Sequence, residues 1–434
     1  MMQQEYHLTV YCMKKLICIF AAVALFASCV QKEDTDRDDP VPVEETARLD
    51  IMPLGPDSPA VHAEGGECTI SFSTNRSWTA DSDSWMTLSS TSGKAGNVTL
   101  TVMTSANEAS KRTGEIKISI PDCSKSISIT QYPAIVSLEP RSKRNLKWVF
   151  NMTYANNTFN TILTQYNKPQ TNMYQTVEAG VNIGLSTVAS QNGVNETWVR
   201  TWKNPSDAGV SLSVPFSVTS NTVHTDFSAI DGYEDYDTDS FIFKTYTGTD
   251  VFNGENYVDP CNSTIKRLAD ELWTEADSDI VSFARKASKW TADNIPYTRM
   301  NTGLHPVQDI LDNGGDCGNQ ASIFISILRA KGIPARHVVL CRVGSAHVRA
   351  EFYLAGYGWI PADPNGEQSV PSVDWFGQVD YDADALVVSL GICNRYDIPL
   401  VGLYNCLLGQ GLCGLWYYWN GETAYDLSFG LAEE

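Results

Sequence analysis

The sequence is poor in positive charge and in histidine. Its 31 Lys and Arg residues are outnumbered by 51 Asp and Glu residues, so the formal net charge is −20. A surface of that sign does not attract nucleic acid or an anionic membrane, and we expect no nucleic-acid partner. The six histidines form no tract, and the eleven cysteines include no Cys-x-x-Cys pair. These absences argue against a zinc cluster, and no metal site is predicted.

A hydrophobic run long enough to span a bilayer comfortably is also missing. The segment MKKLICIFAAVALFASC starts at Met13 and has two lysines, a short apolar stretch and small residues before Cys29, as in a secretory signal peptide. Its end, FASC, resembles a bacterial lipobox, in which the cysteine is lipidated and becomes the mature N-terminus. We predict a lipoprotein signal peptide over residues 1–28, with Met13 as the true start, and a lipid anchor at Cys29. A plain cleaved signal with an incidental cysteine is the alternative.

Residues 29–47 are acidic and contain proline, with little to bury. We therefore expect them to form a flexible tether. The run Lys32-Glu33-Asp34 resembles the export signal of Bacteroidetes surface lipoproteins, which implies a location at the outer membrane or cell surface. The chain of 434 residues leaves room for about three domains.

Residues 48–134 show short runs of alternating apolar and polar residues, as the strands of a β-sandwich require. This stretch resembles the BACON domain, an immunoglobulin-like module of exported Bacteroidetes proteins. The resemblance rests on Trp78, the triplet Trp85-Met86-Thr87, the turn Arg112-Thr113-Gly114 and the final pair Thr130-Gln131. The family implies carbohydrate binding, but both tryptophans occupy positions that normally fill a sandwich core, which favours a spacer role.

Residues 137–256 contain further strand-like runs, such as NLKWVFNMTY and VSLSVPFSVT, separated by turns that contain Asn and Gly. We predict a second β-rich domain there, without a recognisable motif. Asp235, Asp237 and Asp239 alternate in DGYEDYDTDS, and clustered carboxylates can bind calcium. An EF-hand would need Gly and Glu where this chain has Ser240 and Tyr246. A solvated acidic loop is the favoured interpretation.

From residue 257 to residue 434 apolar residues recur three and four apart in several segments, so the third domain is predicted to be α+β. In GGDCGNQASIFISILRAKGIPAR a helix is expected to begin near Cys317 and to end before Gly332 and Pro334. A cysteine in the first turn lies at the positive end of the helix dipole, which favours the thiolate that attacks carbonyl groups. Cys317 is the candidate nucleophile; half of a disulfide, or a buried inert thiol, is the alternative.

A thiolate nucleophile needs a base, and the base needs an orienting group. Alternation in HVRAEFYL puts four residues on one strand face: His347, Arg349, Glu351 and Tyr353. After AGYG the chain continues into WIPADP, which carries Asp363. A hairpin loop of three or five residues keeps His347 and Asp363 on the same face, whereas a loop of four separates them. The spacing therefore permits a Cys-His-Asp triad if the hairpin loop has three or five residues.

The ordered motifs over about residues 260–366 resemble the transglutaminase-like superfamily of papain-type thiol enzymes: a Cys after Gly-x, then GIPAR, then H…E.YL.GYGW.P.DP. The resemblance implies that Cys317 is the nucleophile, His347 the general base and acid, and Asp363 the group that holds the imidazole. It implies a Cys-bearing helix packed on an antiparallel sheet, and a reaction without metal or organic cofactor. Members commonly have an aromatic residue where this chain has Arg349, which would place a cation beside the substrate cleft or alter the chemistry.

The surroundings of the candidate site are less defined. The backbone N–H of Cys317 is the first predicted oxyanion donor, and Trp290 and Tyr297 are candidates for the second. The sequence leaves disulfides open between Cys68 and Cys123 and among four later cysteines, Cys261, Cys393, Cys406 and Cys413. The aromatic C-terminal tail is expected to add sheet and core that close the third domain rather than to line its cleft.

Together the patterns predict a surface lipoprotein in which two β modules carry a transglutaminase-like cysteine enzyme. The expected reaction is cleavage of an amide bond, as a peptidase or amidase, or transfer of the acyl group to an amine, with hydrolysis favoured. The expected partners are an extracellular protein or peptide substrate, with or without glycans, carbohydrate through the BACON domain, and a membrane through the lipid. The alternatives are a catalytically inactive scaffold in a glycan-binding surface protein, and a structural adhesion or spacer protein.

Overall fold

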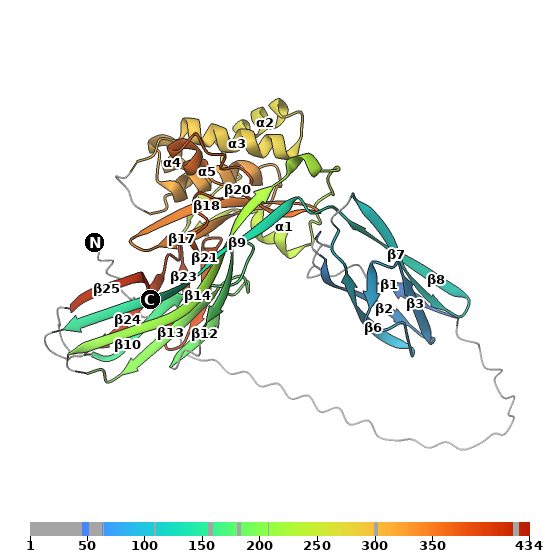
Figure 1. Cartoon of the computed structure of the whole chain (residues 1–434), viewed down its shortest axis with the longest axis horizontal. Coiled ribbons are helices and arrows are strands. Elements are labelled where there is room, and N and C mark those ends of the chain that lie inside the picture. The colour runs from blue at the N-terminus through green and yellow to red at the C-terminus, as the bar shows by residue number, and fades with distance from the viewer. Residues whose placement is uncertain are drawn as a thin grey trace, which may run out of the picture. The chain divides into compact units, whose positions relative to one another are not determined.

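The computed structural model describes residues 46–434, apart from 52–62, 64, 108–109, 155–158, 180–183, 207, 299–302 and 420–424 (Figure 1). The predicted signal peptide (1–28), the lipidation site Cys29 and the predicted tether (29–47) up to residue 45 lie outside the described residues and stay predictions. The described residues from Ala47 to Glu434 belong to one compact unit. Within the described residues, no helix has the length and apolar character needed to cross a bilayer.

The first part of this compact unit is a sandwich of two four-stranded antiparallel sheets, with strand orders β1-β2-β6-β4 and β5-β3-β7-β8. Trp78 is 4% exposed and meets the ring of Phe72 edge-on, with centroids 5.2 Å apart. Trp85 is half-buried, and the Arg112 guanidinium lies 4.5 Å over its ring. Both tryptophans therefore serve the packing of the module itself. The strands are β1 (Leu49–Ile51), β2 (Gly66–Thr74), β3 (Trp78–Ser82), β4 (Met86–Leu88), β5 (Ser92–Gly93), β6 (Gly96–Thr104), β7 (Arg112–Ile120) and β8 (Cys123–Gln131).

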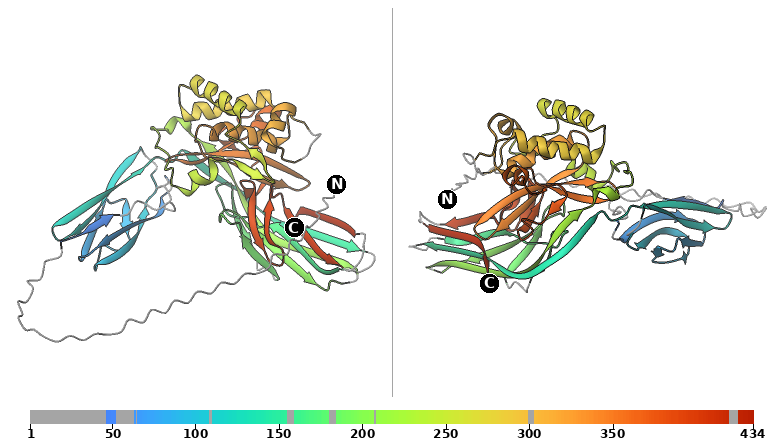
Figure 2. Two further views of the ribbon diagram at one scale, coloured as in Figure 1. Left: turned by 180° about the vertical axis from the view of Figure 1, so that it is seen from behind. Right: turned by 45° about the horizontal axis from the view of Figure 1, so that its top comes forward.

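The second β-rich region is completed by the C-terminal tail. Its two antiparallel sheets have the orders β12-β13-β10-β24 and β11-β14-β9-β25, and Figures 1 and 2 show the last two strands (red) beside the teal and green ones. The expectation that the tail closes the third domain is wrong, because Phe429 stacks on Trp148 of the sandwich core with centroids 5.3 Å apart. The strands are β9 (Val136–Tyr154), β10 (Phe159–Asn167), β11 (Gln175–Ala179), β12 (Leu185–Ala189), β13 (Glu196–Lys203), β14 (Gly209–Thr225), β24 (Leu412–Trp419) and β25 (Tyr425–Glu433).

The third part packs helices on a four-stranded antiparallel sheet in the order β19-β18-β17-β21. Helix α5 (Cys317–Arg329) contacts β17 and β18 as well as α2, α3 and α4, and it is buried from Gly318 to Arg329. Its polar groups stay satisfied: Ser326 donates to the Ser322 carbonyl at 2.7 Å. The elements are η1 (Phe227–Ala229), α1 (Phe241–Tyr246), β15 (Asp250–Phe252), β16 (Glu255–Val258), α2 (Ser263–Glu275), α3 (Ile280–Asn294), α4 (Val307–Asn313), β17 (Ala335–Arg342), β18 (Ser345–Leu354), β19 (Gly358–Ala362), α6 (Pro364–Ser369), β20 (Gln378–Val379), β21 (Leu386–Leu390), β22 (Asn394–Ile398) and β23 (Gly402–Cys406).

The second β-rich region and the third part share one core. Gln175 accepts from the Val387 N–H at 2.9 Å and donates to the Val387 carbonyl at 2.8 Å. Asn195 likewise accepts from the Leu390 N–H and donates to the Leu390 carbonyl, both at 2.8 Å. These amides cover the edge strand β21, whose backbone groups would otherwise lack partners on that side. One buried cluster runs through both regions, so the predicted boundary between 137–256 and 257–434 divides a single core.

Two further expectations concern loops and thiols. In the acidic loop, the Asp239 N–H donates to the Asp237 carboxylate at 2.9 Å, and Asp239 pairs with Lys244 at 2.9 Å. Two of the three carboxylates in this loop therefore have partners from the loop and from the helix that follows it. All eight cysteines within the described residues are free thiols, so none of the disulfides that the sequence left open is formed in this structure.

Candidate active site

The candidate nucleophile lies where the chain turns into α5. Gly314 has φ 75°, and a Cβ there would lie 2.3 Å from the Pro296 carbonyl oxygen, so only glycine fits this passage. Asp316 caps the helix by accepting from the Asn319 N–H at 3.2 Å. Cys317 is the first helical residue, half-buried and a free thiol. The N–H groups of the first turn have no partner within the helix, so the thiol lies in their positive field.

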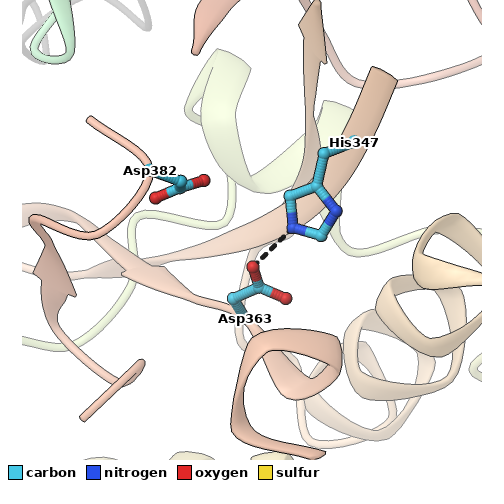
Figure 3. A group of neighbouring side chains, drawn as sticks. All are labelled: His347, Asp363 and Asp382. Atoms are coloured by element: carbon cyan, nitrogen blue, oxygen red, sulfur yellow. Dashed lines mark hydrogen bonds and ion pairs between the residues drawn. The ribbon is translucent and has the colours of Figure 1, made fainter. Parts of the chain in front are cut away.

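His347 and Asp363 meet through the hairpin of β18 and β19. Leu354 pairs with Gly358, so residues 355–357 form a three-residue loop, one of the lengths that keep both side chains on one face. His347 Nε2 lies 2.6 Å from Asp363 Oδ2 (Figure 3). The other oxygen of Asp363 accepts from the Gly366 N–H at 2.9 Å, because Asp363 is also the N-cap of α6. With both oxygens engaged, the orientation of the carboxylate is fixed.

Charge holds these groups together. Burial by itself lowers the pKa of His347, but the Asp363 carboxylate and the neighbouring Cys317, each by charge and hydrogen bonding, raise it to about 10. Burial by itself raises the pKa of Asp363, but the His347 charge, its hydrogen bond and the bond from Gly366 hold it below its usual value. At neutral pH the imidazole is protonated and the carboxylate ionised. The structure thus brings the predicted residues Cys317, His347 and Asp363 together, while their catalytic roles stay predictions.

We expect the His347–Asp363 pair to stabilise the fold below about pH 6.5 and to lose this contribution as the pH rises to about 10. The pKa of His347 is raised on folding from 6.5 to about 10, so its contribution is complete only while the unfolded chain is protonated too. At about 1.4 kcal/mol per pKa unit, the upper limit is on the order of 5 kcal/mol. The free energies of unfolding of wild type and His347→Gln should therefore approach each other between pH 6 and pH 10. A gap that stays constant or widens contradicts the assignment.

Arg349 is not a free cation beside the cleft, which corrects one alternative raised by the sequence. Its side chain is 2% exposed, and its Nη1 lies 3.0 Å from each oxygen of Asp382. The guanidinium also lies 4.4 Å over the ring of Tyr174, from the second β-rich region. Sequence reasoning missed Asp382 and Tyr174, because neither carries a local motif and both reach Arg349 only through the tertiary fold.

The donor atoms of His347, Asp363 and Asp382 lie within 4.8 Å of one another (Figure 3). Such a spacing can suit a metal ion, but metal ligands must be deprotonated and free of competing cations. Here Asp382 is already bound by Arg349, and the Arg342 guanidinium lies 3.7 Å from the same carboxylate. His347 holds a proton toward Asp363. The group fits a cluster of ion pairs, and we assign no metal to it.

A network of side-chain amides links the two helices that begin beside the site. Asn365 donates to Gln320 Oε1 at 2.9 Å, and Gln320 donates to the Ile295 carbonyl at 2.6 Å. Gln320 also donates to Gln368 of α6 at 3.1 Å. The network ties α5, which carries Cys317, to α6, which Asp363 caps. In the sequence, this network is indicated only by the short distance along the chain to the candidate site residues. Gln320 follows Cys317 by three residues, and Asn365 follows Asp363 by two.

The two candidates for a second oxyanion donor differ in position. Tyr297 forms an isolated parallel bridge with Gly315, and its side chain is 43% exposed, so it lies beside the turn that leads to Cys317. Trp290 lies on α3, partly buried against the core. The backbone of Tyr297 thus lies beside the turn before Cys317, and the roles of both residues stay predictions. His337 lies outside the site: burial lowers its pKa to about 3, and it pairs with Ser322 at 3.0 Å.

Two family models match separate parts of the chain. Residues 266–364 match the transglutaminase-like superfamily, and residues 69–132 match BACON, described as an N-terminal binding domain. The predicted transglutaminase-like and BACON domains are thus confirmed, and so is the multidomain fold class of an immunoglobulin-like sandwich with an α+β domain. The first match spans Cys317, His347 and Asp363 and ends one residue beyond Asp363.

Similar proteins come from several bacteria. A protein of Haemophilus influenzae without a described function is 36% identical over a stretch that covers 15% of this chain and 25% of the relative, so the chain spans about a quarter of that relative. A solved structure from Cytophaga hutchinsonii, described as a candidate cysteine protease, has 13% identity and a TM-score of 0.39, covering 68% of this chain and 93% of that one. The periplasmic domain of TgpA from Pseudomonas aeruginosa has 15% identity and a TM-score of 0.29, covering 52% and 89%.

Proposed function

We propose that this chain, which carries a transglutaminase-like domain behind a BACON domain, is a cysteine enzyme that acts on amide bonds. The observation that carries the proposal is the 2.6 Å contact between His347 and Asp363, beside a cysteine at the first position of a buried helix. A thiol nucleophile, a base and a group that orients the base are the parts that such catalysis requires. All three come from different elements, α5, β18 and the end of β19.

In the proposed mechanism the two ring nitrogens of His347 have different partners. Nε2 is held by Asp363, which leaves Nδ1 for the Cys317 thiol. The thiolate of Cys317 attacks the carbonyl carbon of the substrate, the C–N bond breaks, and the imidazolium gives its proton to the departing amine. Water then loses a proton to His347 and attacks the thioester, which releases the acid and restores the thiol. An amine in place of water would give acyl transfer; water is the more abundant acceptor, and hydrolysis is the proposed outcome.

The oxyanion of each tetrahedral intermediate needs hydrogen-bond donors. The backbone N–H of Cys317 is the first N–H of α5, where no helical carbonyl is available to it. It is the proposed first donor, and Tyr297, beside Gly315, is the proposed second. The proposed substrate is an extracellular protein or peptide, with or without glycans. Carbohydrate binding by the BACON domain is not favoured by its tryptophans, since Trp78 is buried.

The rate of iodoacetamide alkylation of Cys317 tests the nucleophile and its base. In wild type we expect rapid modification at neutral pH, followed on the Cys317 peptide by mass spectrometry. In His347→Ala the rate should fall by about 10- to 100-fold, because the thiolate loses the imidazolium that stabilises it. Cys261 is exposed and serves as the internal reference for an ordinary thiol. A Cys317 that reacts no faster than Cys261, or that ignores the His347 substitution, contradicts the proposed function.

A further inference from the structure

His347 lies near two carboxylates, and only one of them binds it. Donor atoms of His347, Asp363 and Asp382 all lie within 4.8 Å of one another, but the hydrogen bond goes to Asp363 alone. Figure 3 shows Asp382 on the side of the ring that carries Nε2. Asp382 would therefore compete with Asp363 for the same N–H. Both carboxylates are buried, at 2% and 4% exposure, so water does not screen the competition.

Asp382 binds Arg349 instead of His347. Arg349 Nη1 is 3.0 Å from both Asp382 oxygens, and Arg342, the other cation near it, is 3.7 Å away and largely solvated. Asp382 lines a cavity of about 180 Å³, whose other charged groups are Arg144, Arg342, Asp384 and Glu433. One guanidinium nitrogen thus contacts both carboxylate oxygens, and a buried hydrogen bond between two charged groups is stronger than one between neutral groups. The four charges at the site are thus arranged as two pairs, His347 with Asp363 and Arg349 with Asp382.

We propose that Arg349 is a positioning residue that binds Asp382 and so reserves the imidazole of His347 for Asp363 and Cys317. This deepens the proposed function and rests on it. Arg349 does not line the cavity next to Asp382, whereas Arg342 and Tyr381 do. A role in contacting substrate is therefore better suited to those two than to Arg349, which acts through Asp382.

The second β-rich region holds Arg349 in place. Tyr174 lies under the guanidinium at 4.4 Å, and its hydroxyl donates to Glu351 at 2.6 Å. A cation over an aromatic face is stabilised further when both are buried. The loop that carries Asp382 is fixed from the same region, because Arg144 of β9 donates to the Asp384 carbonyl. Arg349 of β18 is thus stacked on an aromatic ring from another element.

The test uses iodoacetamide, which is small and neutral and needs no substrate site, on the full chain. In Arg349→Met the Cys317 alkylation rate should fall about 10- to 100-fold, because a displaced imidazole no longer serves the thiol. In Arg349→Met/Asp382→Asn the rate should return to within about threefold of wild type, because replacing both members of a buried pair is often tolerated.

Arg336→Met is the matched control. Arg336 forms a buried pair with Glu351 at 2.6 Å on the same sheet, and Arg336 is 9% exposed against 2% for Arg349. Among the described residues, no hydrogen bond or ion pair joins Arg336 to His347. A purely structural role for Arg349 predicts that both single variants lower the rate alike, and this would overturn the proposal. So would an unchanged rate in Arg349→Met, or a double variant that stays tenfold or more below wild type. If the single variant does not fold, the double variant alone decides.

The His347→Ala variant in the same assay separates the two proposals. If His347→Ala slows the alkylation and Arg349→Met does not, the positioning role fails and the proposed enzyme stands. If neither substitution slows it, the proposed function itself fails.

Discussion

Replacing Cys317 by alanine is expected to abolish turnover of amide substrates and to leave the fold intact. The loss should be about 10⁴-fold or more, because no other group at the site can form the acyl intermediate. The Cys317 side chain is half-buried at the start of the helix and contributes little to the core, so the melting temperature should change little. A peptide and glycopeptide library, assayed against wild type and Cys317→Ala, measures the effect and identifies the substrate class together.

Cys341→Ala is the control for this experiment. Cys341 lies on β17, close to the candidate site along the sheet, but it is 6% exposed and burial raises its pKa to about 12. Such a thiol is inert at neutral pH. We expect Cys341→Ala to keep turnover. Cleavage that survives in Cys317→Ala would refute the assignment of the nucleophile, and cleavage lost only in Cys341→Ala would move it to β17.

Deleting residues 412–434 is expected to prevent folding of everything from β9 onward. These residues supply β24 and β25, and their Leu427, Phe429 and Leu431 pack on the shared core. Seven apolar side chains of the two strands contact that core, and at about 1.5–3 kcal/mol for a fully buried side chain their loss approaches the entire stability of a typical domain. Near-UV circular dichroism and limited proteolysis of the truncated chain measure the outcome.

The control for the deletion is a smaller change in the same core. Phe429→Ala removes the ring that stacks on Trp148 and Tyr166, at 5.3 and 5.7 Å, and should cost about 2–4 kcal/mol without unfolding the chain. His347-dependent alkylation of Cys317 should survive in Phe429→Ala and vanish in the deletion, because Tyr174 and Gln175 of the sandwich contact the sheet that carries His347. A truncated chain that unfolds cooperatively and retains this alkylation contradicts the shared core.

Local patterns were sufficient to single out Cys317, His347 and Asp363 as candidates, which the structure places together. The helix that begins at Cys317 follows from Gly314, Asp316 and the apolar run behind them, because a helix start is decided within a few residues. The pairing of His347 with Asp363 follows from strand alternation once the loop length is known, and register within a hairpin is set by its turn. The BACON module was also predicted from the sequence, because its strands show the alternating pattern and all of them pair within residues 49–131.

The sequence alone did not determine the environment of the triad. Arg349 was visible as an anomaly, but its partners Asp382 and Tyr174, and the edge cover from Gln175 and Asn195, come from segments that no period or motif connects to it. The same holds for the C-terminal strands, which return to β9 and β10 across most of the chain. Pairing between distant strands depends on which apolar faces can cover each other, and that is decided only when the whole core assembles. The sequence by itself therefore determined the candidate chemistry, and the tertiary structure decided what holds that chemistry in place.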